Sequence, residues 1–206
     1  MENTIIDFIL VGQCGSGKTY LGNFLFGKEL LKKFLRHTGI QINSFNGLTI
    51  IETPGVKAYD NAYDNTYDNK ITHEYLVENL RPVKNFRAIL FVLNCGCYRL
   101  TIVMKKIIKE LSIRFSNKIL KNIAFVITNF HSDRKDKSEI MKETPENITY
   151  ELKTEEPLKF FFINSDLKHP EEDSLKEKEK IIEWAKGLTP INTKKLEYEN
   201  LIFKID

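Results

Sequence analysis

Residues 12–19 read Gly-Gln-Cys-Gly-Ser-Gly-Lys-Thr, which is a complete GxxxxGK(S/T) phosphate-binding loop. An apolar run of strand length, residues 5–11, precedes the loop, and residues 20–26 follow it with apolar side chains on a helical spacing. In a strand–loop–helix unit, consecutive backbone N–H groups and the N-terminus of the helix point at one anion. The sequence therefore predicts a nucleoside triphosphate site in an α/β fold.

Each residue of this loop has an expected role. The glycines let the backbone curl around the β-phosphate, Lys18 supplies a charge between the β- and γ-phosphates, and the Thr19 hydroxyl is an expected Mg²⁺ ligand. The predicted nucleotide contacts in this segment are Gly12, Gln13, Cys14, Gly15, Ser16, Gly17, Lys18, Thr19 and Tyr20.

The order of apolar segments predicts a three-layer P-loop fold with a mostly parallel six-stranded sheet. Asn46-Gly47 separates two short strand patterns, and this dipeptide predicts the single antiparallel pairing. The remaining predicted elements are strands at 88–93, 123–127 and 160–163 and helices at 100–115 and 171–186. A chain of 206 residues suits one domain, with a core over about 5–187 and a short C-terminal extension over 188–206.

Two segments break this alternation. Residues 59–70 repeat Tyr-Asp-Asn-x three times, and this composition predicts a loop tip with no packing role. An exposed tyrosine-rich contact loop is the alternative. Residues 134–157 are charged and polar, which predicts a loop with a short helix only at 148–152.

Charge and cysteine content exclude several classes of function. The net charge is only +3 and its charges are interspersed, which gives nucleic-acid binding no support. Three cysteines are too few for a disulfide framework. No signal-peptide pattern and no apolar run of transmembrane length are present. We therefore expect a cytoplasmic protein whose membrane contact, if any, is peripheral and indirect.

The second motif is Glu52-Thr53-Pro54-Gly55, at the end of the apolar run 48–51. A carboxylate at a strand end can reach Mg²⁺, and a glycine three residues later offers its N–H to the γ-phosphate. Loss of that phosphate would release Gly55 and the segment behind it. A tight turn that requires Pro and Gly is the alternative interpretation.

A candidate base pocket follows the predicted strand at 123–127. Guanine specificity usually comes from a carboxylate that accepts hydrogen bonds from the ring N1–H and the exocyclic amine. Asp133 is the candidate carboxylate, and Asn129, Phe130 or His131 would line the base.

The next predicted strand ends at Asn164 and Ser165. We expect the Asn164 side chain and the Ser165 backbone N–H to meet the O6 edge of the base. A surface turn is the alternative for each segment, but two such segments at successive strand ends favour a guanine pocket. The expected cofactors are GTP or GDP with Mg²⁺.

Residues 12–27 resemble the start of the avirulence-induced-gene (AIG) type GTPases, also called GIMAP or immunity-associated nucleotide-binding proteins. These proteins are related to septins and chloroplast import GTPases. The family's Gly-Asn pair after the loop is matched by Gly22-Asn23, and its Asp-Thr-Pro-Gly switch by residues 52–55. Residues 97–101 resemble its Gly-Arg-Phe-Thr segment, and Asn164 falls where the family places a base-contacting Asn.

The resemblance covers roughly residues 5–187 and is greatest to compact amoebal members of the family. It implies an AIG-type G domain that binds and hydrolyses GTP. It also implies that a like subunit supplies charge across the nucleotide face, so that the partner is a second copy in a homodimer.

Several positions depart from the pattern of this family and of small GTPases. Glu52 replaces the usual Asp, and Val56 stands where small GTPases carry a Gln that orients water. Thr38 is the candidate switch threonine, with Ser44 as the alternative. The predicted catalytic residues are therefore Lys18, Thr38 and Gly55, and the predicted Mg²⁺ ligands are Thr19, Thr38 and Glu52.

Three hypotheses follow for function. The first is a GTP-binding switch that hydrolyses GTP slowly and whose nucleotide state controls self-association. The second is a GTP-binding scaffold without effective hydrolysis, which Glu52 and Val56 favour. The third is an ATP-specific P-loop protein, which the nonstandard segment 128–133 favours. Nucleotide competition distinguishes the third from the others.

Overall fold

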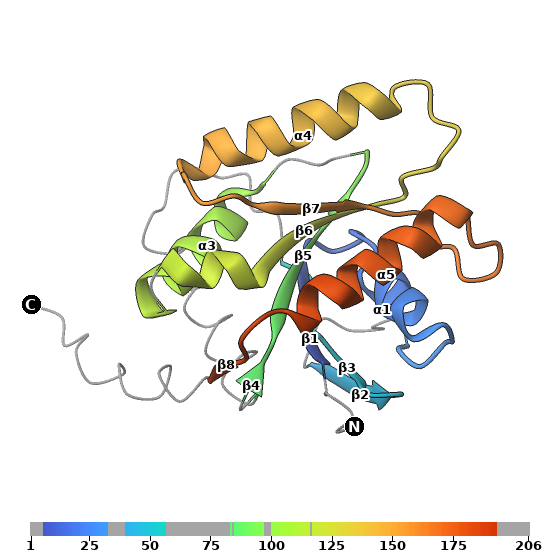
Figure 1. The fold of residues 1–206 in the computed structure, drawn as a ribbon, viewed down its shortest axis with the longest axis horizontal. Helices are drawn as coiled ribbons and strands as arrows, with labels where there is room; N and C mark the ends of the chain where they lie inside the picture. Colours follow the sequence, from blue (N-terminus) through green and yellow to red (C-terminus); the bar gives the residue numbers. More distant parts are fainter. Residues whose placement is uncertain are drawn as a thin grey trace, which may run out of the picture.

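The structure, a computed structural model, describes residues 6–32, 40–56, 83, 85–96, 100–115 and 117–192. The predictions made for Thr38, for the repeat at 59–70 and for the first three residues of the segment at 97–101 lie outside these residues. Figure 1 shows the order of the elements, with a twisted sheet between two sets of helices.

The main sheet has six strands in the order β2-β3-β1-β5-β6-β7. These strands are β1 (Ile6–Gly12), β2 (Gln41–Phe45), β3 (Leu48–Glu52), β5 (Ala88–Asn94), β6 (Ile123–Thr128) and β7 (Lys159–Phe162). All neighbouring strands are parallel except β2 and β3, which pair antiparallel. The predicted fold class, a mostly parallel six-stranded sheet with one antiparallel strand, is confirmed.

The helices are α1 (Lys18–Phe26), α3 (Ile102–Phe115), α4 (Lys137–Leu152), α5 (Glu172–Lys186) and the short 3-10 helix η1 (Asn117–Asn122). Two further strands, β4 (Asn85–Phe86) and β8 (Ile191–Asn192), pair with each other. None of the helices in the described part of the chain is long and apolar enough to cross a membrane.

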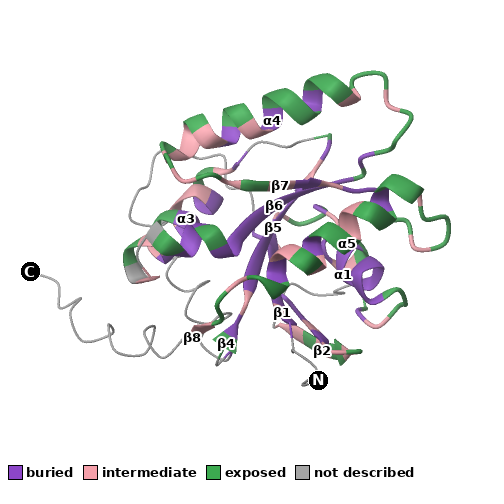
Figure 2. Ribbon diagram, viewed as in Figure 1, coloured by how far each residue is buried: buried purple, intermediate pink, exposed green. Residues whose placement is uncertain are grey.

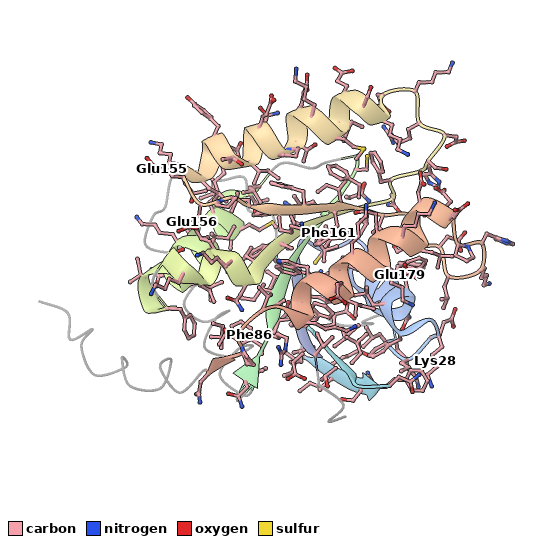
Figure 3. All side chains as sticks on the ribbon, in the orientation of Figure 1. Lys28, Phe86, Glu155, Glu156, Phe161 and Glu179 are labelled. Atoms are coloured by element: carbon pink, nitrogen blue, oxygen red, sulfur yellow. The ribbon has the colours of Figure 1, made fainter. Side chains whose placement is uncertain are left out.

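Two hydrophobic cores form because apolar side chains of β1 alternate between the faces of the sheet. Phe8 and Leu10 belong to the core under α1 and α5, whereas Ile9 and Val11 belong to the core under α3 and α4. Figure 2 shows the central strands as buried almost throughout. Among the side chains labelled in Figure 3, Phe161 is buried in the core under α1 and α5, whereas Glu179 on α5 is exposed.

The β2–β3 hairpin has the turn that its sequence predicts. Asn46 and Gly47 both have positive φ, at 50° and 75°. A two-residue turn with both residues in the left-handed region matches the twist of the flanking strands. The hairpin brings Glu52 to the edge of the sheet at which β1 also ends.

The prediction for residues 134–157 was wrong, because residues 137–152 form the helix α4. Its buried residues are Ile140, Thr144 and Ile148, which recur every four positions and make a narrow apolar stripe. The rest of the helix is polar, and it contains Pro145. A helix with so narrow a stripe has nearly the composition of a polar loop, so composition does not distinguish the two. The helix is stabilised mainly by packing of this stripe against the rest of the protein, because its intrinsic helix propensity is low.

Truncation of this stripe tests the packing of α4. We expect Ile140→Ala to lower the free energy of unfolding by about 2–5 kcal/mol, because it deletes a buried side chain and leaves a cavity. The neighbouring Met141→Ala is the control, because Met141 is 44% exposed and its loss changes little. Urea unfolding measures both, and equal effects would contradict the packing of Ile140 against the sheet.

Candidate functional site

The phosphate-binding loop connects β1 to α1 through a backbone that only glycine fits at two positions. Gly17, at the start of α1, has φ of 92°, and a Cβ there would lie 2.9 Å from Thr128 Oγ1. A Cβ on Gly12 would lie 2.4 Å from the carbonyl oxygen of Val92 on β5. The loop is therefore closely packed against the neighbouring strands at these two glycines.

Lys18 is buried in this loop, with 6% of its surface exposed. Its Nζ donates hydrogen bonds to the carbonyl oxygens of Gly12 at 3.0 Å and Gln13 at 2.8 Å. Burial lowers the pKa of Lys18, and the nearby Glu52 partly offsets this effect. The ammonium group is thus held inside the loop that the sequence predicts to surround a phosphate.

Glu52, the last residue of β3, extends its carboxylate to the first turn of α1. Thr19 Oγ1 donates a hydrogen bond of 2.6 Å to Glu52 Oε1. Glu52 is 2% exposed, and its Oε2 is buried without a hydrogen-bond partner. Burial raises the pKa of Glu52, and the hydrogen bond from Thr19 and the charge of Lys18 lower it in part. A buried carboxylate oxygen in need of a partner, beside a threonine hydroxyl, is an oxygen donor set that fits Mg²⁺.

The segment after Glu52 runs along the phosphate-binding loop. Thr53 Oγ1 donates to the carbonyl of Leu10 at 2.6 Å, and Val56 N donates to the carbonyl of Gly12 at 3.0 Å. A Cβ on Gly55 would lie 2.7 Å from the backbone nitrogen of Cys14. The close approach explains the need for glycine at position 55, and it brings together the two motifs that the sequence predicts to share one ligand.

Thr128, at the end of β6, bonds the phosphate-binding loop to the sheet beside the predicted base pocket. Its Oγ1 donates to the carbonyl of Ser16 at 2.7 Å and lies 3.2 Å from that of Leu93. The hydroxyl of Ser16 is buried without a hydrogen-bond partner. Sequence reasoning did not assign Thr128 a role, because a threonine in a strand pattern is ordinary.

A cavity of about 850 Å³ opens beside this loop. One wall comes from α1 and the residues after it, and the other comes from the ends of β6 and β7. The lining residues are Thr19, Tyr20, Asn23, Glu29, Leu30, Leu31, Lys32, Asn129, His131, Asn164, Ser165, Asp166, Leu167 and Lys168. A second cavity of about 820 Å³, between α3 and the end of α4, contains none of the motif residues.

The structure brings together most of the predicted base-pocket residues. Asn129, His131, Asn164 and Ser165 all line the cavity. Asn164 Nδ2 lies 3.1 Å from His131 Nδ1. Asn129 has a positive φ of 54°, which turns the chain sharply at the end of β6.

The structure does not bring Asp133 to this cavity, because Asp133 is exposed and lies outside the lining. Asp133 stands two residues after His131, where the chain has already turned toward α4. Asp136 is bound by the Arg134 guanidinium through contacts of 2.9 and 2.7 Å. The carboxylates that line the cavity are Glu29 and Asp166. The distance along the sequence between a strand end and a loop carboxylate does not fix where that carboxylate points.

Glu171 is a site residue that the sequence reasoning missed. Its Oε1 accepts a hydrogen bond of 2.7 Å from Asn164 Nδ2, and its Oε2 accepts one of 2.8 Å from the backbone of Ser132. Partial burial raises the pKa of Glu171, but the hydrogen bonds from Asn164, Ser132 and His131 outweigh burial and leave the pKa below its usual value. In the sequence, Glu171 stands at the start of a polar helix, where acidic residues are common, so its position does not indicate a contact with Asn164.

Asn23 anchors the wall formed by residues 29–32. Its Oδ1 accepts hydrogen bonds from the backbone N–H groups of Leu30 at 2.9 Å and Leu31 at 2.7 Å. Its Nδ2 donates to the carbonyl of Leu31 at 3.0 Å. The Gln41 side chain on β2 accepts a hydrogen bond from the N–H of Lys32 and donates one to the carbonyl of Lys32.

Replacement of Asn23 tests this anchor. We expect Asn23→Ala to lower the free energy of unfolding by about 1–3 kcal/mol, because the backbone N–H groups of the half-buried Leu30 and the buried Leu31 lose their partner. Gln41→Ala removes similar bonds at an exposed site, so its effect should stay within about 1 kcal/mol. Chemical unfolding compares the two, and a larger loss for Gln41→Ala would contradict the assignment.

The comparisons with known proteins agree with this geometry. A model of the AIG1 family matches residues 6–188. The comparison with curated proteins finds no match. Among solved structures, Toc33 from Arabidopsis thaliana in complex with Mg²⁺ and GMPPNP aligns with a TM-score of 0.64 at 16% identity, over 93% of this chain and 89% of that one.

Two other solved structures have the same fold. One, reported under the statement that dimerization is important for the GTPase activity of the chloroplast translocon components atToc33 and psToc159, has a TM-score of 0.57 and 15% identity, over 80% of this chain and 72% of that one. The other, a probable GTP-binding protein engB, has a TM-score of 0.53 and 17% identity, over 87% of this chain and 98% of that one. Because the family model spans most of its length, this chain belongs to the AIG1 family, as its phosphate-binding loop and switch motif predict.

Proposed function

We propose that this protein, as a single G domain, is a guanine-nucleotide switch that binds GTP or GDP with Mg²⁺ and hydrolyses GTP slowly. The observation that carries the proposal is the buried Glu52 carboxylate, whose Oε2 has no partner and whose Oε1 is bonded to Thr19 beside Lys18. Unpartnered buried carboxylate oxygens are costly, and a bound cation would relieve that cost. Membership of the AIG1 family supports the same activity.

Thr19 and Glu52 would hold the Mg²⁺, and Lys18 with the loop N–H groups would hold the β- and γ-phosphates. The ion would neutralise phosphate charge and orient the γ-phosphate. Thr38 is proposed to complete the Mg²⁺ site. Gly55 is proposed to contact the γ-phosphate. The close approach of Gly55 to Cys14 of the phosphate-binding loop supports this role.

Slow hydrolysis is supported by Val56. Its side chain is apolar and 2% exposed, and its backbone N–H is bonded to Gly12. It therefore offers no group that can orient an attacking water, a role that a glutamine fills in small GTPases. A second copy that supplies charge across the nucleotide face would raise the rate, and the statement attached to the chloroplast relatives, that dimerization is important for GTPase activity, supports this arrangement.

The cavity beside the loop is the proposed guanine site. We assign the exocyclic 2-amino group of guanine to Asp166, because Asp166 lines the cavity while Asp133 does not. Asp166 Oδ1 accepts hydrogen bonds from the backbone of Lys168 and His169, which fixes the carboxylate and leaves Oδ2 for the base. These backbone bonds, foremost that from Lys168, hold the pKa of Asp166 below its usual value and keep it ionised.

Loss of the Lys18 charge tests the phosphate site. Lys18→Ala should weaken binding of a non-hydrolysable GTP analogue by on the order of 100-fold or more, because a charge-assisted contact to phosphate is lost. Lys28→Ala is the matched control, since it removes the same charge from an exposed residue whose Nζ lies over the Phe45 ring. Calorimetry measures both affinities, and retained affinity in Lys18→Ala would contradict the phosphate site.

Inosine nucleotides, which lack the 2-amino group, test the role of Asp166. Wild-type protein should prefer GTP to ITP, and Asp166→Asn should reduce that preference by about 10-fold, because an ionised acceptor becomes a neutral amide. Asp133→Asn should keep the wild-type preference. Competition against a fluorescent GDP analogue gives both ratios. If Asp133→Asn reduces the preference for GTP over ITP and Asp166→Asn does not, Asp133 is the carboxylate that binds the 2-amino group.

A further inference from the structure

Glu171 immediately precedes α5 and has the backbone conformation of a helix cap, with φ of −73° and ψ of 143°. A short polar side chain such as Asp at this position commonly accepts a hydrogen bond from the first turn of its own helix. The Glu171 side chain makes no such bond. It points instead toward the ends of β6 and β7, where its two oxygens accept hydrogen bonds from Ser132 and Asn164.

The first turn of α5 holds Asn164 from two directions. Glu171 Oε1 accepts from the Asn164 side chain at 2.7 Å, and Ser174 Oγ accepts from the Asn164 backbone N–H at 2.9 Å. Ser174 is 2% exposed and Asn164 is 8% exposed. These contacts fix both the position and the rotamer of a residue that lines the cavity.

The chemistry of Glu171 also fixes which way the Asn164 amide faces. An ionised carboxylate only accepts hydrogen bonds, so the nitrogen of the amide must face it. The pKa of Glu171 is held below its usual value because its hydrogen bonds outweigh its partial burial, and Glu171 is therefore ionised at neutral pH. His131 Nδ1 lies 3.1 Å from the same Nδ2 and 3.3 Å from Glu171 Oε1, so the imidazole lies against the contact between Asn164 and Glu171.

With its nitrogen bonded to Glu171, the Asn164 amide has Oδ1 on its other side, and Oδ1 is the group that remains for a ligand. This differs from the expectation that Asn164 meets the O6 edge of guanine, because O6 requires a donor. Oδ1 accepts, and it suits a ring N–H. Guanine and hypoxanthine carry a hydrogen on N1, whereas adenine has a lone pair there.

We propose that Glu171 is a positioning residue that holds Asn164 with Oδ1 toward the cavity, so that the cavity selects purines with an N1–H and rejects adenine. The inference rests on the proposed guanine site and names the atom of this chain that discriminates at N1. Glu171 does not contact the base in this account. It acts through Asn164.

Glu171→Gln tests the claim with little change of shape. A glutamine amide can present either its oxygen or its nitrogen, so the Asn164 amide would no longer be held in one orientation. We expect the preference for ITP over ATP to fall about 10-fold or more, because one oriented hydrogen bond is lost and an unfavourable one with adenine is relieved. ITP is used because it has the N1–H but lacks the amino group assigned to Asp166.

Glu172→Gln is the matched control. Glu172 is the next residue, its side chain is 81% exposed, and its partner is Lys176 at 2.6 Å. The Glu172→Gln substitution removes the same charge from the same helix end and should leave the ITP-to-ATP ratio unchanged. An equal fall in both variants would assign the effect to helix charge and overturn the positioning role.

A double substitution separates positioning from a general structural effect. If Glu171 acts through Asn164, then adding Glu171→Gln to Asn164→Ala should not reduce the ITP-to-ATP ratio further. Binding of inorganic tripolyphosphate, which has no base, should be equal in wild type and Glu171→Gln. Additive losses in the double variant, or weaker tripolyphosphate binding, would overturn the inference.

The Asn164 side-chain resonance gives a readout that needs no nucleotide. In the ¹H–¹⁵N spectrum, its amide signal, assigned by its loss in Asn164→Ala, should shift in Glu171→Gln and stay in place in Glu172→Gln. An unshifted signal would overturn the positioning role. Wild-type protein that binds triphosphate without preferring GTP or ITP to ATP would instead overturn the guanine site, while a shifted signal would still establish the contact with Glu171.

Discussion

The parallel pairing of β1 with β3 on one side and β5 on the other determines where the phosphate-binding loop and the Glu52 motif lie. Leu10 pairs with Glu52 and Gly12 pairs with Val92, so the phosphate-binding loop and the Glu52 carboxylate emerge together from one edge of the sheet. Ligands of open α/β sheets bind at this edge because the strand ends and helix N-termini converge there. The bond from Thr19 to Glu52 is the direct result of this register.

The base side of the site depends on contacts from outside the sheet. Thr128 bonds the loop carbonyl of Ser16, and the first turn of α5 holds Asn164 through Glu171 and Ser174. α5 is itself anchored in the core by Ile181 and Ala185, which are fully buried. The geometry of the cavity is therefore maintained by a packed helix, so that Asn164, which lies on a loop, is held as firmly as a residue on a strand.

The fold was predictable from sequence, and so was the convergence of the residues proposed to hold phosphate and Mg²⁺, because each rests on a local rule. The loop glycines, the Asn46-Gly47 turn and the continuous apolar strands each specify a backbone state. The base side was less predictable. His131 and Glu171 meet only after folding, and no sequence spacing indicates that Glu171 leaves its own helix uncapped to bond Asn164. α4 was missed because three buried residues in a polar segment give a weak period.

The most direct test of the central claim is displacement of a fluorescent GDP analogue by unlabelled GTP and ATP in the presence of Mg²⁺, with molecular mass followed by light scattering. Guanine specificity predicts displacement by GTP and not by ATP, and a nucleotide switch predicts a dimer that forms only in the triphosphate state. Equal displacement by ATP would contradict the guanine site and would make this chain an ATP-binding member of the P-loop fold.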